Sequence, residues 1–220
     1  MKKKLIKYSK LYLKIAIIMG LLVSCVGNMV VVDAHPVNPD WDGAAAAAYA
    51  KQYAIHYNKD FDSWDSDCTN FASQCVKAGL KPMDSTDEKP QKGGKINETS
   101  SKWYYKIGKG NKYVTTTSWV RCSGKHAFAN YWDKYKVGAY KKLENVYSHA
   151  SLGDVIQITL KDGTLKHSIV VTEVNRKTKT LKCSSHTKDY YNDSLDEIAK
   201  RAKKDWGEVK FTVFHFYSTY

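Results

Sequence analysis

The sequence lacks several motifs on which common enzyme classes depend. Its cysteines form no CxxC pair, its histidines form no HExxH or His-x-x-x-His pair, and no GxSxG is present. Structural zinc sites and many zinc enzymes need the first two patterns, and hydrolases with a serine at a nucleophile elbow need the third. These absences speak against a zinc ribbon, a metalloenzyme and a serine hydrolase. We therefore expect no metal and no cofactor.

Acidic residues are also scarce. The 220 residues include 35 Lys and Arg but only 22 Asp and Glu, which gives a formal net charge of +13. Six lysines and one acid precede His35, so 29 basic and 21 acidic residues remain from there on, an excess of +8. This surplus favours polyanionic surroundings such as nucleic acid, anionic lipid or phosphate-bearing wall polymers. Because no basic cluster is interleaved with aromatic residues, nucleic acid is disfavoured as a partner.

Hydrophobic residues make up 43% of the chain, which at this length indicates one packed domain plus processing segments. The pattern predicts helices over 42–57, 68–78, 124–136 and 194–204, and strands over 153–160, 166–174, 179–186 and 208–217. Residues 80–102 read as a long polar loop and a candidate mobile flap. Helices first and an antiparallel meander of about four strands second predict an α+β domain.

The first 34 residues have the pattern of an export signal. A lysine-rich start precedes an apolar stretch over 15–32, and small residues lead up to His35. We expect cleavage after Ala34 and a secreted or wall-associated mature protein over 35–220. The apolar stretch has 18 residues, the lower limit for a membrane span, and Gly and Asn interrupt it. The alternative is lipidation of Cys25, because "LVSC" resembles a bacterial lipoprotein box, and only that would place the protein at a membrane.

Four cysteines follow the expected cleavage site: Cys68, Cys75, Cys122 and Cys183. An even number in an exported protein invites disulfides. However, Cys68 and Cys75 lie on one predicted helix with about 10.5 Å of rise between them, too far for a bridge. A bridge between Cys122 and Cys183 stays open, although no spacing pattern supports it. Disulfides therefore do not explain these cysteines.

Cys68 follows an N-cap residue, Asp67, and so begins a helix. The unpaired N–H groups and the dipole of a helix N-terminus stabilise a thiolate, which is the nucleophilic form of cysteine. The alternative is that Cys68 is a small buried residue, as most cysteines are. Cys75 and Cys183 fit that alternative well.

A cysteine nucleophile needs a base, and His167 is the best placed of seven histidines because it opens a predicted strand after a turn. If residues 175–178 form the hairpin loop, Val174 faces Lys179 and His167 lies directly opposite His186. Opposed residues point to the same face of a sheet, so His186 would orient the His167 imidazole. The other candidates for this third role are Asp189 and, further away, Asn192.

Several segments resemble, in order, a known family: "YAxxYAxxYN", "DCTNFASQC", "KWYY", "TTSW", "GDVIQI", "KHSIVVT" and "SSHTKDYYNDSL". They are similar to the putative amidase domain of exported Gram-positive proteins, a family related to the NlpC-type and CHAP cysteine peptidases. The resemblance implies a papain-like single domain, with N-terminal helices packed on a C-terminal antiparallel sheet. It implies these roles: nucleophile Cys68, base His167, polar third member His186, and site support from Asp67, Asn70 and Gln74, with Ser118 and Trp119 loosely matched and near the cleft.

The resemblance implies hydrolysis of amide bonds by a Cys-His-His triad, with peptidoglycan or wall peptides as substrate. The cysteine precedes the histidine, which favours hydrolysis over the lipid acyl transfer of permuted relatives. Wall-binding repeats are lacking, so attraction to anionic wall polymers would rest on the domain and its charge. Two alternatives stay open: a catalytically inactive wall-binding module of the same fold, and a surface lipoprotein acting as adhesin or scaffold. The amide that is cut, whether in a wall peptide, the sugar–peptide link or a protein, is also open.

Overall fold

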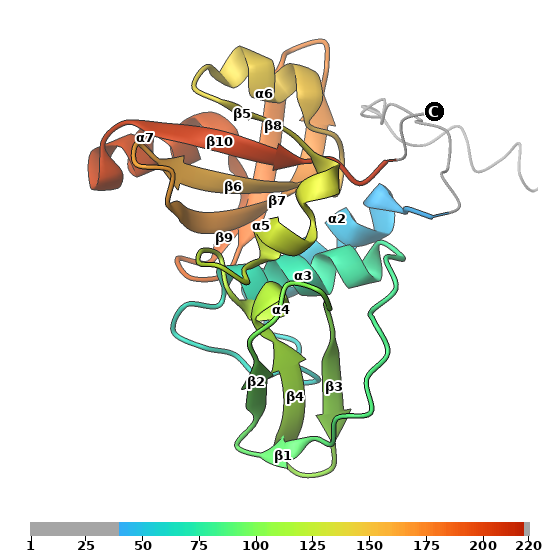
Figure 1. Cartoon of the computed structure of the whole chain (residues 1–220). Coiled ribbons are helices and arrows are strands. Elements are labelled where there is room, and N and C mark those ends of the chain that lie inside the picture. The colour runs from blue at the N-terminus through green and yellow to red at the C-terminus, as the bar shows by residue number, and fades with distance from the viewer. Residues whose placement is uncertain (1–39, 218–220) are drawn as a thin grey trace, which may run out of the picture. The chain divides into compact units, whose positions relative to one another are not determined.

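A computed structural model describes residues 40–217 of the protein (Figure 1). The predicted export signal over 1–34, including Cys25, lies outside the described residues. The described chain is a mixed α+β structure, as the sequence predicted. It contains a sheet of six strands and a sheet of four strands. Figure 1 shows the six-stranded sheet on one side of helix α3 and the smaller sheet on the other.

The six-stranded sheet is antiparallel throughout, in the order β5-β10-β6-β7-β8-β9. Its strands are β5 (Lys136–Tyr140), β6 (Val155–Leu160), β7 (Leu165–Asn175), β8 (Thr180–Ser185), β9 (Tyr190–Ser194) and β10 (Val209–Phe214). Four of them, β6, β7, β8 and β10, are the predicted meander. The sequence prediction of about four strands missed β5 and β9, which lie at the two edges of the sheet.

Both faces of this sheet are buried, and successive residues of one strand enter different cores. In β7, Val170 packs into the core that includes α2 (Gly43–Tyr53) and α3 (Cys68–Ala78). Its neighbours Ile169 and Val171 pack into the core that includes α6 (Leu143–His149) and α7 (Leu195–Trp206). A strand covered on both faces has no polar side, which is why the apolar pattern did not reveal which face is core.

Helix α2 begins where its cap residue predicts. The Asp42 carboxylate accepts a hydrogen bond from Ala45 N at 2.8 Å. The alanines that follow are strong helix formers and are small enough for close packing. Gly43 is required there, since a Cβ would lie 2.2 Å from the Leu152 carbonyl oxygen. The helix ends at Tyr53 rather than at 57 as expected.

Helix α3 matches its predicted bounds, and every residue from Cys68 to Val76 is buried. Asp67 occupies the N-cap position, but its carboxylate does not cap the helix N–H groups. It is used in contacts with other segments, described below. The helix packs against both α2 and strand β7. The start of α3, where Cys68 lies, is therefore held by contacts from outside the helix.

The segment expected as a long polar loop carries part of the smaller sheet. Its strands are β1 (Gln91–Lys92), β2 (Lys95–Asn97), β3 (Tyr105–Gly108) and β4 (Lys112–Thr116), and each of the first three pairs with β4. Most of 80–102 is loop, as predicted, but the prediction missed the two short strands β1 and β2 within it. Strands of two to five residues give too short a pattern to be recognised without the strand they pair with.

The prediction of one helix over 124–136 was also wrong. The structure has two single turns there, α5 (Phe128–Tyr131) and a 3₁₀ turn (Asp133–Tyr135), and strand β5 then begins at Lys136. A further single turn, α4 (Thr117–Val120), follows β4. Burial of Phe128 and Trp132 in the core shared with α2 and α3 stabilises these short turns. Tertiary packing overrides a helical pattern of this length.

The predicted register of the β7–β8 hairpin was wrong. Val174 pairs with Leu181 rather than Lys179, and a bulge at Thr172 shifts the pairing so that Val170 faces Ser184. A bulge adds one unpaired residue and so moves every later pair. Strand β8 ends at Ser185, and left-handed backbone at Thr187, Lys188 and Asp189 turns the chain toward β9. His186 lies in this turn and is not paired opposite His167.

Candidate active site

Cys68 lies at the N-terminus of α3, on the wall of a cleft of about 490 Å³. His167, near the start of β7, and Cys122, in the loop between α4 and α5, line the same cleft. The Cys68 side chain is 6% exposed and His167 is 4% exposed. Three segments far apart in the sequence therefore bring two thiols and an imidazole to one partly enclosed site.

The surroundings of Cys68 favour its thiolate. A hydrogen bond from Cys122 holds the pKa of Cys68 well below its usual value. Burial opposes this, while a hydrogen bond and the charge of His167 lower the pKa further. The other thiols differ: burial raises the pKa of Cys75 and of Cys183, and the hydrogen bond to Cys68 raises that of Cys122. Cys68 therefore has the most nucleophilic sulfur of these four cysteines.

His167 has a partner that the sequence reasoning missed. Its Nε2 lies 3.1 Å from Ser185 Oγ, at the end of β8. Its ring also makes an edge-to-face contact with Tyr190, with the ring centres 5.8 Å apart. Since Nε2 is engaged with Ser185, Nδ1 is the nitrogen left for the Cys68 sulfur. The only sequence signal for Ser185 was its place directly before His186.

His186 is held by another set of contacts. Its Nδ1 lies 2.5 Å from Asp67 Oδ2, and its Nε2 lies 2.8 Å from the Tyr53 carbonyl oxygen. The imidazole stacks between Tyr57 and Phe71, with ring centres 3.8 and 4.1 Å away. Both ring nitrogens are thus committed away from His167. The geometry expected for His186, an imidazole that orients His167, is not what the structure has.

Asp67 joins this cluster to the start of α3. Besides His186, its carboxylate accepts hydrogen bonds from Trp64 N at 3.1 Å and Asn70 Nδ2 at 2.9 Å. Its backbone N–H donates to Thr187 Oγ1 at 2.7 Å. His186 and Asp67 are each 1% exposed. The contact between His186 and Asp67 therefore links the turn after β8 to the start of α3, next to Cys68.

The other predicted support residues stabilise the wall behind the cleft. Asn70 Oδ1 accepts a hydrogen bond from Trp119 Nε1 at 2.8 Å, and Gln74 Oε1 accepts one from Tyr49 OH at 2.8 Å. The Ser118 hydroxyl donates to the Lys102 carbonyl oxygen. Ser118 and Trp119 are fully buried, and the cleft is lined instead by Val120, Arg121 and Cys122, the residues that follow them.

The two runner-up candidates for the third role also have other partners. Asp189 Oδ1 accepts a hydrogen bond from Tyr57 OH at 2.9 Å. Asn192 Oδ1 accepts one from Thr172 Oγ1 at 2.7 Å, and its Nδ2 donates to Glu173 at 2.7 Å. Ser185 is thus the side chain that the structure brings to the far nitrogen of His167.

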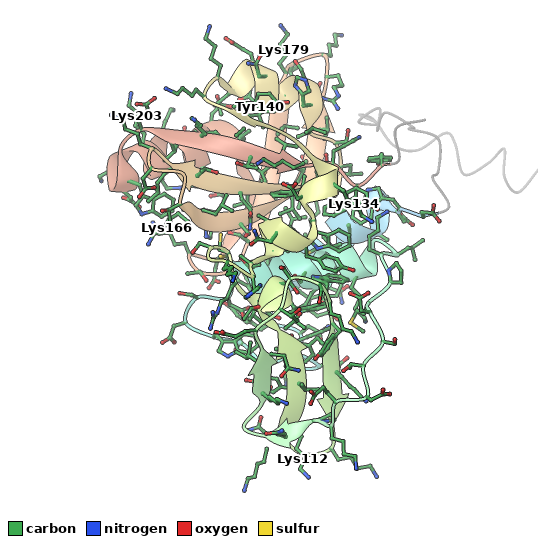
Figure 2. The ribbon with its side chains drawn as sticks, viewed as in Figure 1. Lys112, Lys134, Tyr140, Lys166, Lys179 and Lys203 are labelled. Carbon is green, nitrogen blue, oxygen red and sulfur yellow. The ribbon has the colours of Figure 1, made fainter. Side chains whose placement is uncertain are left out.

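The charged residues that line the cleft are cationic: Arg121, Lys166 and Lys188. Arg121 pairs with Glu98, and Lys188 pairs with Asp205, both at exposed positions. Lys166, labelled in Figure 2, directly precedes His167 in β7. Two of these cations are thus paired with exposed acids, and Lys166 adds positive charge at the rim.

Within residues 40–217, no group of three His, Cys, Asp or Glu side chains is placed to hold a metal ion. In the same described range, no helix is both long and apolar enough to cross a membrane. The described cysteines Cys68, Cys75, Cys122 and Cys183 are all free thiols. A bridge between Cys122 and Cys183, left open by the sequence, is therefore not formed in this structure.

Comparison with known proteins places the chain in a family. Residues 40–210 match the model of the family described as "Putative amidase domain", and the chain belongs to that family. It is also similar to the "Uncharacterized protein YjcM" of Bacillus subtilis (strain 168), at 30% identity over 183 residues. That match covers 79% of this chain but only 37% of the relative's length. No solved structure matches.

Proposed function

We propose that the protein is an exported cysteine amidase or endopeptidase that hydrolyses amide bonds in cell-wall peptides. Membership of the putative amidase family supports amide hydrolysis. The observation that carries the cysteine chemistry is the pairing of Cys68 with His167 at the cleft, with the thiol pKa held well below its usual value. A helix that presents a cysteine to a histidine on an antiparallel sheet also supports a papain-like fold of the NlpC or CHAP type.

The proposed reaction proceeds through an acyl-enzyme. The Cys68 thiolate attacks the amide carbonyl carbon, and N–H groups at the start of α3 stabilise the oxyanion. His167 holds the proton from Cys68 and gives it to the leaving amine as the C–N bond breaks. Water, deprotonated by His167, then attacks the thioester, and the Cys68 sulfur leaves as the thiolate. Ser185 orients the His167 ring, so the triad we propose is Cys68, His167 and Ser185, with His186 supporting it through Asp67.

Wall peptide is proposed as the substrate on grounds of charge and export. The cationic rim formed by Arg121, Lys166 and Lys188 suits a substrate that carries carboxylates. The excess of +8 from His35 onward suits a wall rich in anionic polymers. A secreted or wall-associated location follows from the export signal proposed at 1–34.

Digestion of purified Gram-positive wall tests this function. Mass spectrometry of the released fragments identifies which bond is cut. Wild type and the Cys75→Ala variant, whose lost thiol lies in α3 away from the cleft, should release the same fragments. Cys68→Ala should release none. Equal release by Cys68→Ala would overturn the proposed function, and binding to wall without release by any form would indicate the inactive binding module.

Alkylation provides an independent check on the nucleophile. Limiting iodoacetamide followed by peptide mapping should label Cys68 before Cys75, Cys122 and Cys183, because its pKa is lowered while theirs are raised. Loss of activity should follow the labelling of Cys68. Preferential labelling of Cys122 with activity retained would contradict the assignment.

A further inference from the structure

Cys122 is the side chain at the cleft that the proposed reaction leaves without a role. It lies 54 positions after Cys68 in the sequence, yet both thiols line the same cleft. The Cys122 sulfur accepts hydrogen bonds from Ser168 Oγ and from Gln157 Nε2, each at 3.6 Å. Two strands, β6 and β7, thus supply donors that hold this sulfur in place.

In the hydrogen bonds that reach Cys122, its sulfur is the acceptor. Because Ser168 gives its single proton to Cys122, its oxygen acts as acceptor toward Gln157 Nε2 at 3.0 Å and Thr69 Oγ1 at 2.9 Å. The same Thr69 oxygen lies 3.8 Å from the Cys68 sulfur. The Cys122 sulfur thus accepts from two donors, Ser168 and Gln157. Its own S–H proton is then available to the Cys68 sulfur, which lines the same cleft.

The position of Gln157 has an energetic cost. Its side chain is fully buried, and its Oε1 is among the buried side-chain atoms without a hydrogen-bond partner in the described part of the chain. An unsatisfied buried acceptor costs about 1–3 kcal/mol. Its Nε2 nevertheless donates to both Cys122 and Ser168. This indicates that the donors of Gln157, rather than its acceptor, are what the site uses.

We propose that Cys122 is a positioning residue, whose thiol donates a hydrogen bond to the Cys68 thiolate and keeps that sulfur directed into the cleft. This role rests on the proposed function of Cys68 as nucleophile. The opposite shifts of the two thiols agree with it: the pKa of Cys68 is lowered and that of Cys122 is raised, so the shared proton resides on Cys122. Cys122 forms no bond to substrate and is not a catalytic residue.

The test is the pH dependence of Cys68 alkylation by iodoacetamide, followed by peptide mass spectrometry. In Cys122→Ala the midpoint should rise by about one pH unit or more, which makes labelling roughly tenfold slower than in wild type at a pH well below both midpoints. Cys122→Ser, which keeps a donor of similar size, should recover part of the shift. Cys75→Ala is the matched control and should leave the midpoint unchanged. Circular dichroism confirms that each variant is folded.

The outcomes separate this inference from the proposed function. An unchanged midpoint in folded Cys122→Ala would overturn the inference, as would equal midpoint shifts in Cys122→Ala and Cys75→Ala. Because alkylation needs no substrate, a raised midpoint supports the role of Cys122 even if no wall amide is cut. The reverse result is also informative. If wall cleavage depends on Cys68 but the alkylation midpoint does not depend on Cys122, the proposed function is supported and the inference about Cys122 is contradicted.

Discussion

The two histidines that the sequence predicted for one triad have different partners, so we propose different roles for them. His167 lies at the cleft with Cys68 on one side and Ser185 on the other. His186 faces two oxygen acceptors, the Asp67 carboxylate and the Tyr53 carbonyl. A hydrogen bond therefore links Asp67 and His186, which are each 1% exposed. In the proposed mechanism, His186 stabilises the site, whereas Ser185 orients the base.

Paired substitutions distinguish these roles. His186→Ala leaves Asp67 buried without its partner, and we expect the free energy of unfolding to fall by about 3–5 kcal/mol. Ser185→Ala removes one hydrogen bond to a buried imidazole and should lower stability by about 0.5–1.5 kcal/mol. Turnover should fall about tenfold or more in Ser185→Ala, because the partner that orients a catalytic imidazole contributes to turnover. Guanidinium unfolding and wall-fragment release measure the two quantities.

The opposite pattern would contradict the triad proposed here. Should Ser185→Ala retain full turnover while folded His186→Ala loses it at unchanged stability, the base would be oriented by His186 through a different arrangement. Asp189→Ala serves as the control, since Asp189 is exposed and its carboxylate accepts a hydrogen bond from Tyr57 rather than from His167.

Between elements, Glu173 joins a helix and three strands. Its carboxylate bonds Lys51 of α2 at 2.9 Å, Lys182 of β8 at 2.9 Å and Asn192 of β9 at 2.7 Å. Partial burial would raise the pKa of Glu173, but the hydrogen bonds from these three residues outweigh it and lower the pKa to about 2. The position lies directly after the bulge at Thr172, where the β7–β8 ladder is irregular.

Glu173→Gln should weaken this junction in a pH-dependent way. A carboxylate whose pKa falls from 4.5 to about 2 on folding adds stability above about pH 4.5, and this is lost as the pH falls toward 2. The side chain is 38% exposed, so screening keeps the effect below about 1 kcal/mol. Urea unfolding from pH 7 to 2 should show wild type more stable at neutral pH and the two forms converging in acid.

Glu144→Gln, at an exposed position of α6, is the matched control for this charge change. A constant difference between wild type and Glu173→Gln across the whole pH range would mean that the carboxylate charge is not what stabilises the junction.

At the scale of the whole molecule, exposed lysines gather on the smaller sheet. The β1–β4 sheet carries exposed Lys92, Lys106, Lys109 and Lys112, and Figure 2 shows Lys112 at the end of that sheet away from α3. Such a surface suits electrostatic attraction to anionic wall polymers, as proposed from the charge excess. The attraction would bring the domain to its substrate only if the chain is exported.

Export is tested by N-terminal sequencing of the protein recovered from the culture medium and wall of a Gram-positive host. We expect the mature chain to begin near His35 and to be recovered without detergent. A diacylated Cys25 with the protein in the membrane fraction would show that the lipoprotein alternative is right. A chain that keeps its first 34 residues inside the cell would contradict export altogether.

Local signals determined more of the fold than of the site. Helix α3 and the strands β6, β7, β8 and β10 carry long patterns and caps, and the sequence predicted each of them. The β1–β4 sheet, the edge strand β5 and the single turns near Phe128 were missed or misassigned. Their segments are short, and their conformation depends on pairing with β4 or β10 and on burial against a distant core.

The sequence by itself determined that Cys68 begins a helix and that His167 lies near the start of a strand, because caps and turns act over a few residues. Only the tertiary structure decided their partners. The bulge at Thr172 and the end of β8 put Ser185 beside His167 and sent His186 to Asp67, while the loop after α4 brought Cys122 to Cys68. Such contacts depend on register and on the packing of segments distant in sequence, which no local pattern encodes.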